Sequence, residues 1–373
     1  MTFRERYFAT LLFGKPDRIP FMPGGPREST RRVWYQQGLP ADQNFFDAML
    51  EHLGLPPIPG GMVGTDVSFK MIPTFEEKVL EHKDGHYIVQ DWMGAITEIS
   101  DEFDYTYIRS AKDFVTRKWH KFPVETRADW EVMQERFQVD APGRFPADFA
   151  EQCGKIDSSN SIVSIQVNGP FWQLREWCGF ENLCLLFIED PEFVQQMIDF
   201  WTEFVSQVIA RIQQHVVIDR VGLSEDMAYK AHSMISPAMS RQFLLPAYRR
   251  WVEEVKAAGT TIIDMDSDGF IGELIPIWID AGINVCDPIE VAAYNDIVDF
   301  RARFGKKMGY GGGVDKRAIA AGGKVIEDEI ARIAPVIKDG GFIPGCDHGV
   351  PPDISWPNFL NYSRLIAQQC GWL

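Results

Sequence analysis

The sequence lacks several features that would place it in common protein classes. No run approaches the roughly 20 apolar residues of a membrane span, and the first residues, MTFRERY, lack the apolar core of a signal peptide. Positive charge is scarce as well: 37 lysines and arginines stand against 53 acidic residues, a net charge of −16. Nucleic acids and anionic membranes would repel such a surface. We therefore expect a cytoplasmic protein that binds neither partner.

Signature motifs are also missing. The six cysteines show no paired spacing, so a disulfide framework is not expected. Neither C-x-x-C nor H-E-x-x-H occurs, and no G-x-G-x-x-G or G-x-x-x-x-G-K-[ST] follows a strand-like run. The three glycines at 311–313 are the nearest approach. These absences weaken the interpretation as a doubly wound, nucleotide-binding sheet.

What is present is the alternation of short apolar runs with amphipathic segments. The 373 residues, 45% hydrophobic and 24% charged, are typical of a globular enzyme with a large core. Strand-like runs occur at 161–167, 220–223, 260–265, 283–286, 307–310 and 341–343. Helical runs at 192–214, 237–257, 271–281 and 324–338 lie between them. Such alternation predicts parallel βαβ units. With two earlier candidate strands we predict a (β/α)8 TIM barrel; an open doubly wound sheet is the alternative.

The N-terminal half departs from this alternation. Helices are expected over 2–13, over 27–37 and over 42–53, and residues 69–110 alternate apolar and polar side chains with turns at 84–85 and 93–94. This pattern predicts a β-hairpin or meander. We expect one domain over 1–373, with 67–155 as an insertion or cap.

Acidic side chains follow most of the predicted strands. For any one of them, capping the next helix is the commoner role. Together, however, carboxylates at one end of a barrel repel one another unless a cation, a proton or a basic substrate balances them. The acids concerned are Glu225, Asp226, Asp264, Asp266, Asp268, Asp287 and Glu290.

The last predicted strand ends in Cys346, Asp347 and His348. A thiolate, an imidazole and carboxylates of neighbouring loops suit Zn²⁺ with one open position. A catalytic His348 without metal is a direct alternative, and a Cys346–His348 nucleophile–base pair is a further one.

Five segments in order along nearly the whole chain resemble the uroporphyrinogen decarboxylase superfamily. They are GKPDRIP (14–20), NGP (168–170), SPAMSRQFLLP (236–246), GGGVD (311–315) and CDHGVPPDI (346–354). The resemblance implies a (β/α)8 barrel that forms a dimer. It also implies one of two chemistries: cofactor-free decarboxylation of uroporphyrinogen, or zinc-dependent methyl transfer to or from a corrinoid protein.

The decarboxylase pattern matches in part. His348 fits its C-terminal histidine motif and Asp66 its central aspartate, but its N-terminal substrate motif is replaced by GGPRESTRR (24–32). The position of its active-site serine is taken by Asp226. An acidic mouth would disfavour a substrate rich in carboxylates.

The corrinoid-dependent methyltransferase branch also matches in part. Cys346 fits the last zinc cysteine of that branch, whereas its His-x-Cys pair is replaced by Asp266-Ser-Asp268. Two carboxylates and a thiolate can still bind zinc, with His348 or Glu225 completing the shell. Residues 225–230 resemble an uncharacterised branch that acts on methylated small molecules.

The preferred hypothesis is therefore a methyltransferase or demethylase that passes a methyl group from a small substrate to a corrinoid protein. Zinc held by Asp266, Asp268 and Cys346 would act as a Lewis acid. The expected catalytic residues are His348, Asp66, Glu225 and Asp226. The expected substrate-binding residues are Arg27, Asn168, Phe171, Trp172 and Tyr229, with Trp172 or Trp177 offering an aromatic face to a methylated cation.

Two other functions stay open at this point. A decarboxylase would use Asp66 and His348 to deliver protons, and Arg27 and Arg31 to bind substrate carboxylates. A non-catalytic small-molecule binder would not depend on His348 or Cys346.

Overall fold

A computed structural model describes residues 1–103 and 116–373 of the chain, in two compact units. The first unit contains residues 1–64, 155–166 and 217–373, and the second contains residues 65–154 and 167–216. The second unit thus takes in most of the predicted insertion 67–155 together with a later segment. Within the described ranges, no helix combines the length and apolar character that crossing a membrane requires.

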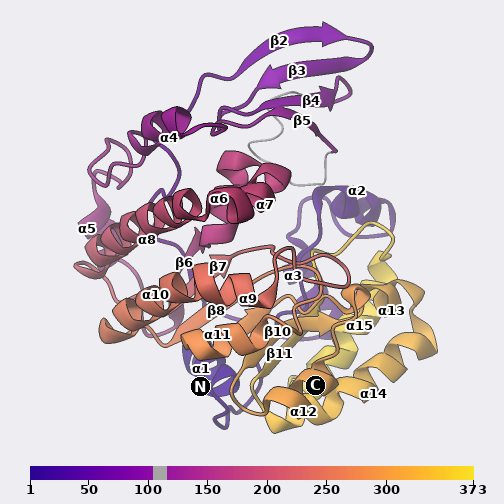
Figure 1. The fold of residues 1–373 in the computed structure, drawn as a ribbon. Helices are drawn as coiled ribbons and strands as arrows, with labels where there is room; N and C mark the ends of the chain where they lie inside the picture. The colour runs from indigo at the N-terminus through magenta and orange to yellow at the C-terminus, as the bar shows by residue number, and fades with distance from the viewer. Residues whose placement is uncertain (104–115) are drawn as a thin grey trace. The chain divides into compact units, whose positions relative to one another are not determined.

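The first unit is built on a parallel sheet of seven strands in the order β1-β6-β7-β8-β9-β10-β11. Figure 1 labels β6, β7, β8, β10 and β11 of this sheet. The strands are β1 (Gly61–Val63), β6 (Ser161–Asn168), β7 (Arg220–Ser224), β8 (Ile262–Asp266), β9 (Val285–Asp287), β10 (Gly309–Val314) and β11 (Phe342–Cys346). The six strand-like runs of the sequence correspond to β6–β11. The predicted parallel α/β architecture is therefore confirmed.

This sheet is curled. Met62 of β1 and Cys346 of β11 belong to the two ends of the strand order, yet both line one cavity. The structure pairs seven strands where the sequence predicted eight. Beside β11 runs an extended segment, residues 19–25, whose Pro23 carbonyl accepts a hydrogen bond from Cys346 N at 3.1 Å. Pro20 and Pro23 have no N–H to donate, so this segment cannot form a regular ladder.

Helices follow the strands as predicted. They are α10 (Leu245–Ala257), α11 (Ile275–Ala281), α12 (Ile297–Phe304), α13 (Lys316–Ala321), α14 (Gly323–Asp339) and α15 (Trp356–Gln369). The predicted helix 237–257 is α9 (Pro237–Met239), then a π-helical turn over Ser240–Leu244, then α10. Pro246 follows this turn and has no N–H for the regular i→i−4 pattern.

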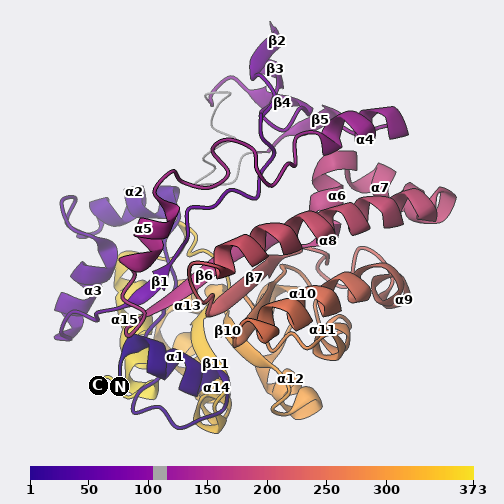
Figure 2. The ribbon, with the colours of Figure 1, turned by 90° about the vertical axis from the view of Figure 1, so that its left-hand side faces the viewer.

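Helix α1 (Phe3–Leu11) lies beside β11 (Figure 2). Its start is fixed by Thr2, whose side chain accepts from Glu5 N while the Glu5 carboxylate accepts from Thr2 N, a capping box. Tyr7 and Leu11 are buried against Ile162, Ile262, Val285 and Ile343 of the sheet. The helical spacing of the first residues therefore serves to place Tyr7 against the strands.

The second unit contains an antiparallel sheet in the order β2-β3-β4-β5 (Figure 1). Its strands are β2 (Lys78–Lys83), β3 (His86–Gln90), β4 (Ile96–Ser100) and β5 (Lys118–Lys121). Asp84 and Gly85 join β2 to β3 with φ of 51° and 75°, the left-handed pair that a tight hairpin turn needs. The predicted meander is thus confirmed, except for its residues 104–110, which lie outside the described ranges.

Helices complete the second unit: α4 (Arg127–Gln134), α5 (Phe149–Gly154), α6 (Pro170–Cys178), α7 (Phe180–Glu189) and α8 (Pro191–Gln213). Trp130, Phe137, Trp177 and Trp201 pack ring against ring among them, with centroids 4.8 to 5.8 Å apart. Much of the aromatic content of this unit is therefore core.

In the first unit, α2 (Glu28–Gln36) is anchored to the segment that follows β11. The Trp34 indole N–H donates to the Ile354 carbonyl at 2.8 Å, and the Thr30 hydroxyl donates to the Val350 carbonyl at 2.7 Å. Both side chains are fully buried. The two bonds hold the helix that carries the N-terminal arginines against the loop that carries His348.

Replacing Thr30 by Val keeps the shape of this side chain and removes its hydroxyl. We expect the free energy of unfolding, measured by urea denaturation, to fall by about 1 kcal/mol, because a buried hydrogen bond is lost. Thr261→Val, at an exposed threonine of the same unit, should change it by less than about 0.5 kcal/mol. Equal effects of the two variants would contradict the anchoring role of Thr30.

Candidate active site

The strand register brings acidic side chains together at the carboxyl end of the sheet. Ser224 of β7 pairs with Asp266 of β8, and Asp266 pairs with Asp287 of β9. These three residues therefore lie at one level across adjacent strands. The expectation that acids converge at this end of the sheet is borne out for Asp266 and Asp287.

Two residues before Asp266 on β8, Asp264 forms a buried ion pair with Arg220. The Arg220 guanidinium donates to Asp264 Oδ2 from Nε at 3.0 Å and from Nη2 at 2.5 Å. Its other amino group donates to Ser164 and Gln166 of β6 at 3.1 and 3.2 Å. The strand position between Arg220 and Ser224 is Gly222, where an added Cβ would lie 1.9 Å from Gln166 Oε1 and 2.9 Å from Arg220 Nη1. A glycine is needed there because the Gln166 side chain and the guanidinium that it contacts both lie against it.

Burial acts on the carboxyl groups of this cluster. It raises the pKa of Asp266 to about 7, and the negative charges of Asp226, Asp264 and Asp268 add to the effect. Burial also raises the pKa of Asp287 well above its usual range, with Asp264 as the next cause. Both groups therefore hold protons more tightly than ordinary aspartates do.

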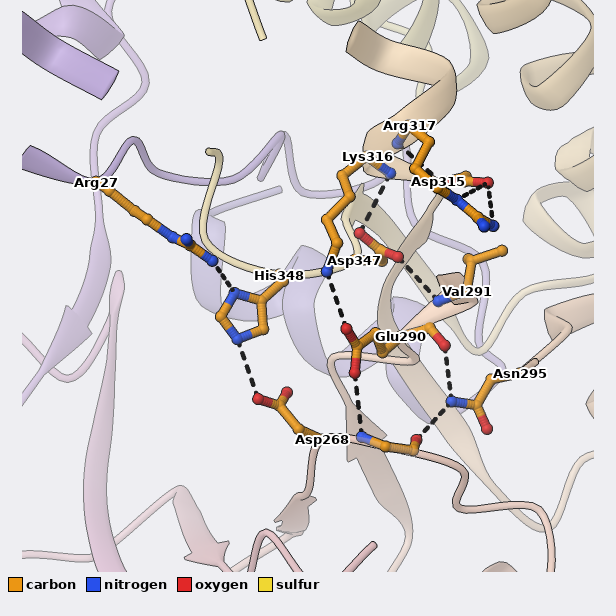
Figure 3. Close-up of polar contacts among 11 residues, drawn as sticks. Arg27, Asp268, Glu290, Val291, Asn295, Asp315, Lys316, Arg317, Asp347 and His348 are labelled. Carbon is orange, nitrogen blue, oxygen red and sulfur yellow. Dashed lines mark hydrogen bonds and ion pairs between the residues drawn. The ribbon is translucent and has the colours of Figure 1, made fainter. Parts of the chain in front are cut away.

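At the mouth, His348 lies between an arginine and a carboxylate (Figure 3). Arg27 Nη2 is 3.1 Å from His348 Nδ1, and His348 Nε2 is 3.0 Å from Asp268 Oδ2. A guanidinium only donates, so Nδ1 accepts here and Nε2 carries the hydrogen that is donated to Asp268. The hydrogen bond to Asp268 raises the pKa of His348, while burial and the charges of Lys316 and Arg27 lower it.

A second set of contacts holds the loop of Asp268 in place (Figure 3). Asp268 N donates to Asp226 Oδ1 at 3.0 Å, and Asp226 itself has the left-handed φ of 36°. Gly269 N donates to Glu290 at 3.2 Å, and Lys316 Nζ donates to the other oxygen of Glu290 at 3.0 Å. The backbone carrying Asp268 is thus tied to the loops after β7 and β9.

Asp347 stands between Cys346 and His348 and is fully buried. Its carboxylate accepts hydrogen bonds from Val291 N at 2.8 Å and Lys316 N at 3.2 Å. Burial raises its pKa to about 6, although Lys316 opposes the shift. Asp347 therefore joins three loops around the base of His348.

The predicted zinc ligands do not converge. In the ranges 1–103 and 116–373, no three histidine, cysteine or acidic side chains lie close enough to hold a metal ion. Asp268 bonds His348, and Asp266 accepts from the Ser224 hydroxyl at 3.3 Å. Burial raises the pKa of the Cys346 thiol to about 12. As placed, these residues do not fit zinc, because no three of them converge.

Two of the other predicted residues lie elsewhere in the first unit. Glu225 is fully buried, and its carboxylate accepts a hydrogen bond from Tyr248 of α10. Successive side chains of a strand point to opposite faces, and Glu225 follows Ser224, which faces the acids. Tyr229 is largely exposed on the loop after β7.

The remaining predicted residues belong to the second unit. Asp66 is exposed and has a left-handed φ of 50°. Asn168 and Trp172 both donate to Glu176, at 3.2 and 2.8 Å, so these three side chains lie together. Burial raises the pKa of Glu176.

Two aromatic side chains of α6, in the same unit, were also expected at the site. Phe171 is fully buried. Trp177 is fully buried as well, in the aromatic core described above. A ring in that core has no face left for a substrate, so the expected role of Trp177 is not supported.

Sequence reasoning did not assign roles to Arg220, Tyr7 or Lys316. Arg220 begins a strand, where sequence gives no sign of a charge reaching inward. Tyr7 read as one apolar position of an amphipathic helix. Lys316 follows Asp315, which caps α13, so local reasoning explains that segment without a site.

Comparison with known families assigns this part of the chain to a family. The family profile described as uroporphyrinogen decarboxylase (URO-D) matches residues 161–364, which hold β6 to β11 and the His348 loop. The chain belongs to the uroporphyrinogen decarboxylase family. No curated protein sequence matches this URO-D chain significantly.

Two solved structures were compared with this chain at low identity. A methyltransferase from Methanosarcina mazei superposes with a TM-score of 0.58 at 14% identity, covering 99% of this chain and 98% of that one. A B12-independent methionine synthase from Shewanella sp. W3-18-1, solved with selenomethionine, gives 0.37 at 10% identity, covering 60% and 65%. The first likeness shows a common fold.

The contacts of His348 predict opposite shifts in two variants. Asp268→Asn should lower the pKa of His348 because the carboxylate that raises it is removed, and Arg27→Gln should raise it because a nearby positive charge is lost. Titration of the imidazole proton signals by NMR measures both shifts. Asp353→Asn, at an exposed position after the same loop, should leave the titration unchanged.

The hydrogen bond between His348 and Asp268 predicts that the stability of the protein depends on pH. A raised histidine pKa in the folded protein stabilises folding fully below the ordinary value of about 6.5, and this contribution is lost as pH rises through the raised pKa. Wild type should therefore exceed Asp268→Asn in unfolding free energy more at about pH 5 than at about pH 9. The reverse order would contradict the hydrogen bond to Asp268.

Proposed function

We propose that this URO-D family member is a methyltransferase that moves a methyl group from a small methylated substrate to the reduced corrinoid of a partner protein. The observation that carries the proposal is the charge of the site. Three cations of the site are already bonded: Arg27 to His348, Lys316 to Glu290 and Arg220 to Asp264. Carboxyl groups outnumber these cations, which suits a neutral or cationic substrate better than a polycarboxylate.

His348 is the proton donor in this proposal. As the methyl group leaves, its bond to oxygen, nitrogen or sulfur breaks with the electron pair remaining on that atom, which then takes a proton from the imidazolium form of His348 and leaves the neutral imidazole. The acceptor supplies the electron pair of the new bond to the methyl carbon. Asp268 holds the imidazole and raises its pKa toward the range in which a proton is present and can be given up. Asp226 orients the Asp268 backbone.

The fuller architecture belongs to the same proposal. We infer that residues 19–25 complete a (β/α)8 barrel beside β11, supported by the hydrogen bond from Cys346 N to Pro23 O. A cytoplasmic homodimer that docks a corrinoid protein at the carboxyl end of the strands is the assembly expected of it. A zinc site at Asp266, Asp268 and Cys346 stays a prediction from the sequence, checked by elemental analysis of wild type and Cys346→Ser purified without chelator.

The test is an assay of methyl transfer from a panel of N-, O- and S-methyl compounds to chemically reduced cobalamin, followed by absorbance. We expect methylcobalamin to form with at least one class of donor. His348→Gln should slow that reaction by about a hundredfold or more, the usual contribution of a positioned acid. Asp353→Asn is the matched control and should react at the wild-type rate. No methylcobalamin from any donor would overturn the proposal.

A decarboxylase is the second candidate, and the contact of Arg27 with His348 favours it. That pair could place a substrate carboxylate beside a proton donor. Incubation with uroporphyrinogen separates the candidates, because loss of carboxylates from this substrate, abolished in His348→Gln, would establish decarboxylation instead.

A further inference from the structure

The curled sheet of the first unit lines an open cavity of about 160 Å³. Residues of α1, β1, β7, β8, β9, β10 and β11 line it. An apolar cavity of about 150 Å³ in another protein holds a benzene molecule, so there is room here for a ligand of up to about six heavy atoms. Cys346 is part of the lining, and His348 stands two residues after it.

One buried polar atom in this lining has no partner. Asp264 is 2% exposed, and Oδ2 accepts both hydrogen bonds of the Arg220 guanidinium. Its other oxygen, Oδ1, accepts no hydrogen bond from any described residue. Buried carboxylate oxygens are rarely left in this state, because the loss of solvation is not compensated. Asp264 Oδ1 is therefore free to accept a hydrogen bond from a donor in the cavity, either water or a ligand.

A second carboxyl group lies on the cavity wall. The Asp287 side chain borders Gly311, where an added Cβ would lie 3.4 Å from Oδ2. Within the described ranges its carboxyl group forms neither a hydrogen bond nor an ion pair. Burial, and next the charge of Asp264, raise its pKa well above the usual range. This carboxyl group holds a proton when nothing else neutralises it.

The charges of the lining fix the charge of a fitting ligand. Arg220 balances Asp264, and burial keeps Tyr7 neutral by raising its pKa. Asp287 can give up its proton when a cation lies beside it, and it then supplies one negative charge with no other counterion among the described residues of the lining. A monocation would balance it.

The rest of the wall is apolar and includes Leu11, Met22, Met62, Val285 and Ile343. Such a surface receives methyl groups, whereas ammonium itself would leave it unused. The site thus combines one unpaired acceptor, one excess negative charge and an apolar wall.

We propose that this cavity binds a small methylated ammonium ion that keeps at least one N–H, with that N–H donated to Asp264 Oδ1 and the positive charge beside Asp287. The ion is the substrate of the methyl transfer proposed above, so the inference rests on that function for its role. The binding of the ion to the cavity is argued independently of that function. A cavity that holds only water would satisfy Asp264 equally well and is the competing occupant.

Titration calorimetry on the whole chain tests this with dimethylammonium, trimethylammonium, tetramethylammonium and the neutral, similarly sized tert-butanol. We expect the two ions with N–H groups to bind, tetramethylammonium to bind about tenfold or more weakly because it cannot donate to Asp264, and tert-butanol not to bind measurably.

Three variants locate the binding. Asp287→Asn removes the charge at a side chain with no structural hydrogen bond, and should weaken binding by about tenfold to a hundredfold. Gly311→Ala narrows the cavity from β10, because its Cβ would lie 3.2 Å from the Asp287 Cβ. It should weaken the binding of trimethylammonium more than the binding of dimethylammonium. Asp353→Asn should bind like wild type.

The outcomes are separable. Three results would each overturn the site and leave water as its occupant. Neither methylated ion with an N–H binds, or tert-butanol binds equally well, or the affinities are unchanged in Asp287→Asn and Gly311→Ala. Those results would leave methyl transfer from other donors intact. Conversely, binding with the expected dependence on Asp287 supports the site even if no methyl group is transferred, in which case the proposed function fails alone.

Discussion

The buried ion pair of Arg220 and Asp264 is the contact on which the rest of the site depends. It joins β7 to β8 and reaches β6 through Ser164 and Gln166, so three strands share one guanidinium. Removing either partner of a buried pair leaves an uncompensated charge, at a cost of about 3–5 kcal/mol. Among the described residues that line the cavity, Arg220 is the only cation, and it is bound in this pair. Because Arg220 neutralises Asp264, the acids nearer the mouth have no counterion from the core. They therefore either keep their protons or bind a cation.

Most of the architecture could be predicted from the sequence, because the signals were local and repeated. Apolar runs at 161–167 and 220–223 alternated with amphipathic segments, and β6, β7 and the helices appear within a few residues of them. The segment 19–25 was harder: its prolines permit an extended backbone and forbid a regular ladder, so strand propensity and pairing disagree. The register of the strands, which places Asp266 between Ser224 and Asp287, is a long-range property that no single segment encodes.

The site was predictable in residue type more than in role. Acids at strand ends were visible, and His348 with Asp268 is brought together by the fold. Glu225 was expected at the mouth because it follows a strand beside other acids, and strand alternation turns its carboxylate toward Tyr248. Arg220 was invisible for the opposite reason: its position at the start of a strand suggested solvent, and only the glycine two residues later hints that a long side chain crosses there.

The glycine run of β10 has a consequence for the diversity of such sites. At Gly311 the strand presents bare backbone to Asp287 and the cavity, and at Gly312 the left-handed φ of 80° and the nearby Pro288 carbonyl exclude a side chain. One of these two positions can therefore vary in size and the other cannot. Relatives that carry alanine, serine or valine at the first position would have cavities reduced by one, two or three non-hydrogen atoms. The residue at this position of β10 would then set the largest ligand that each family member can bind.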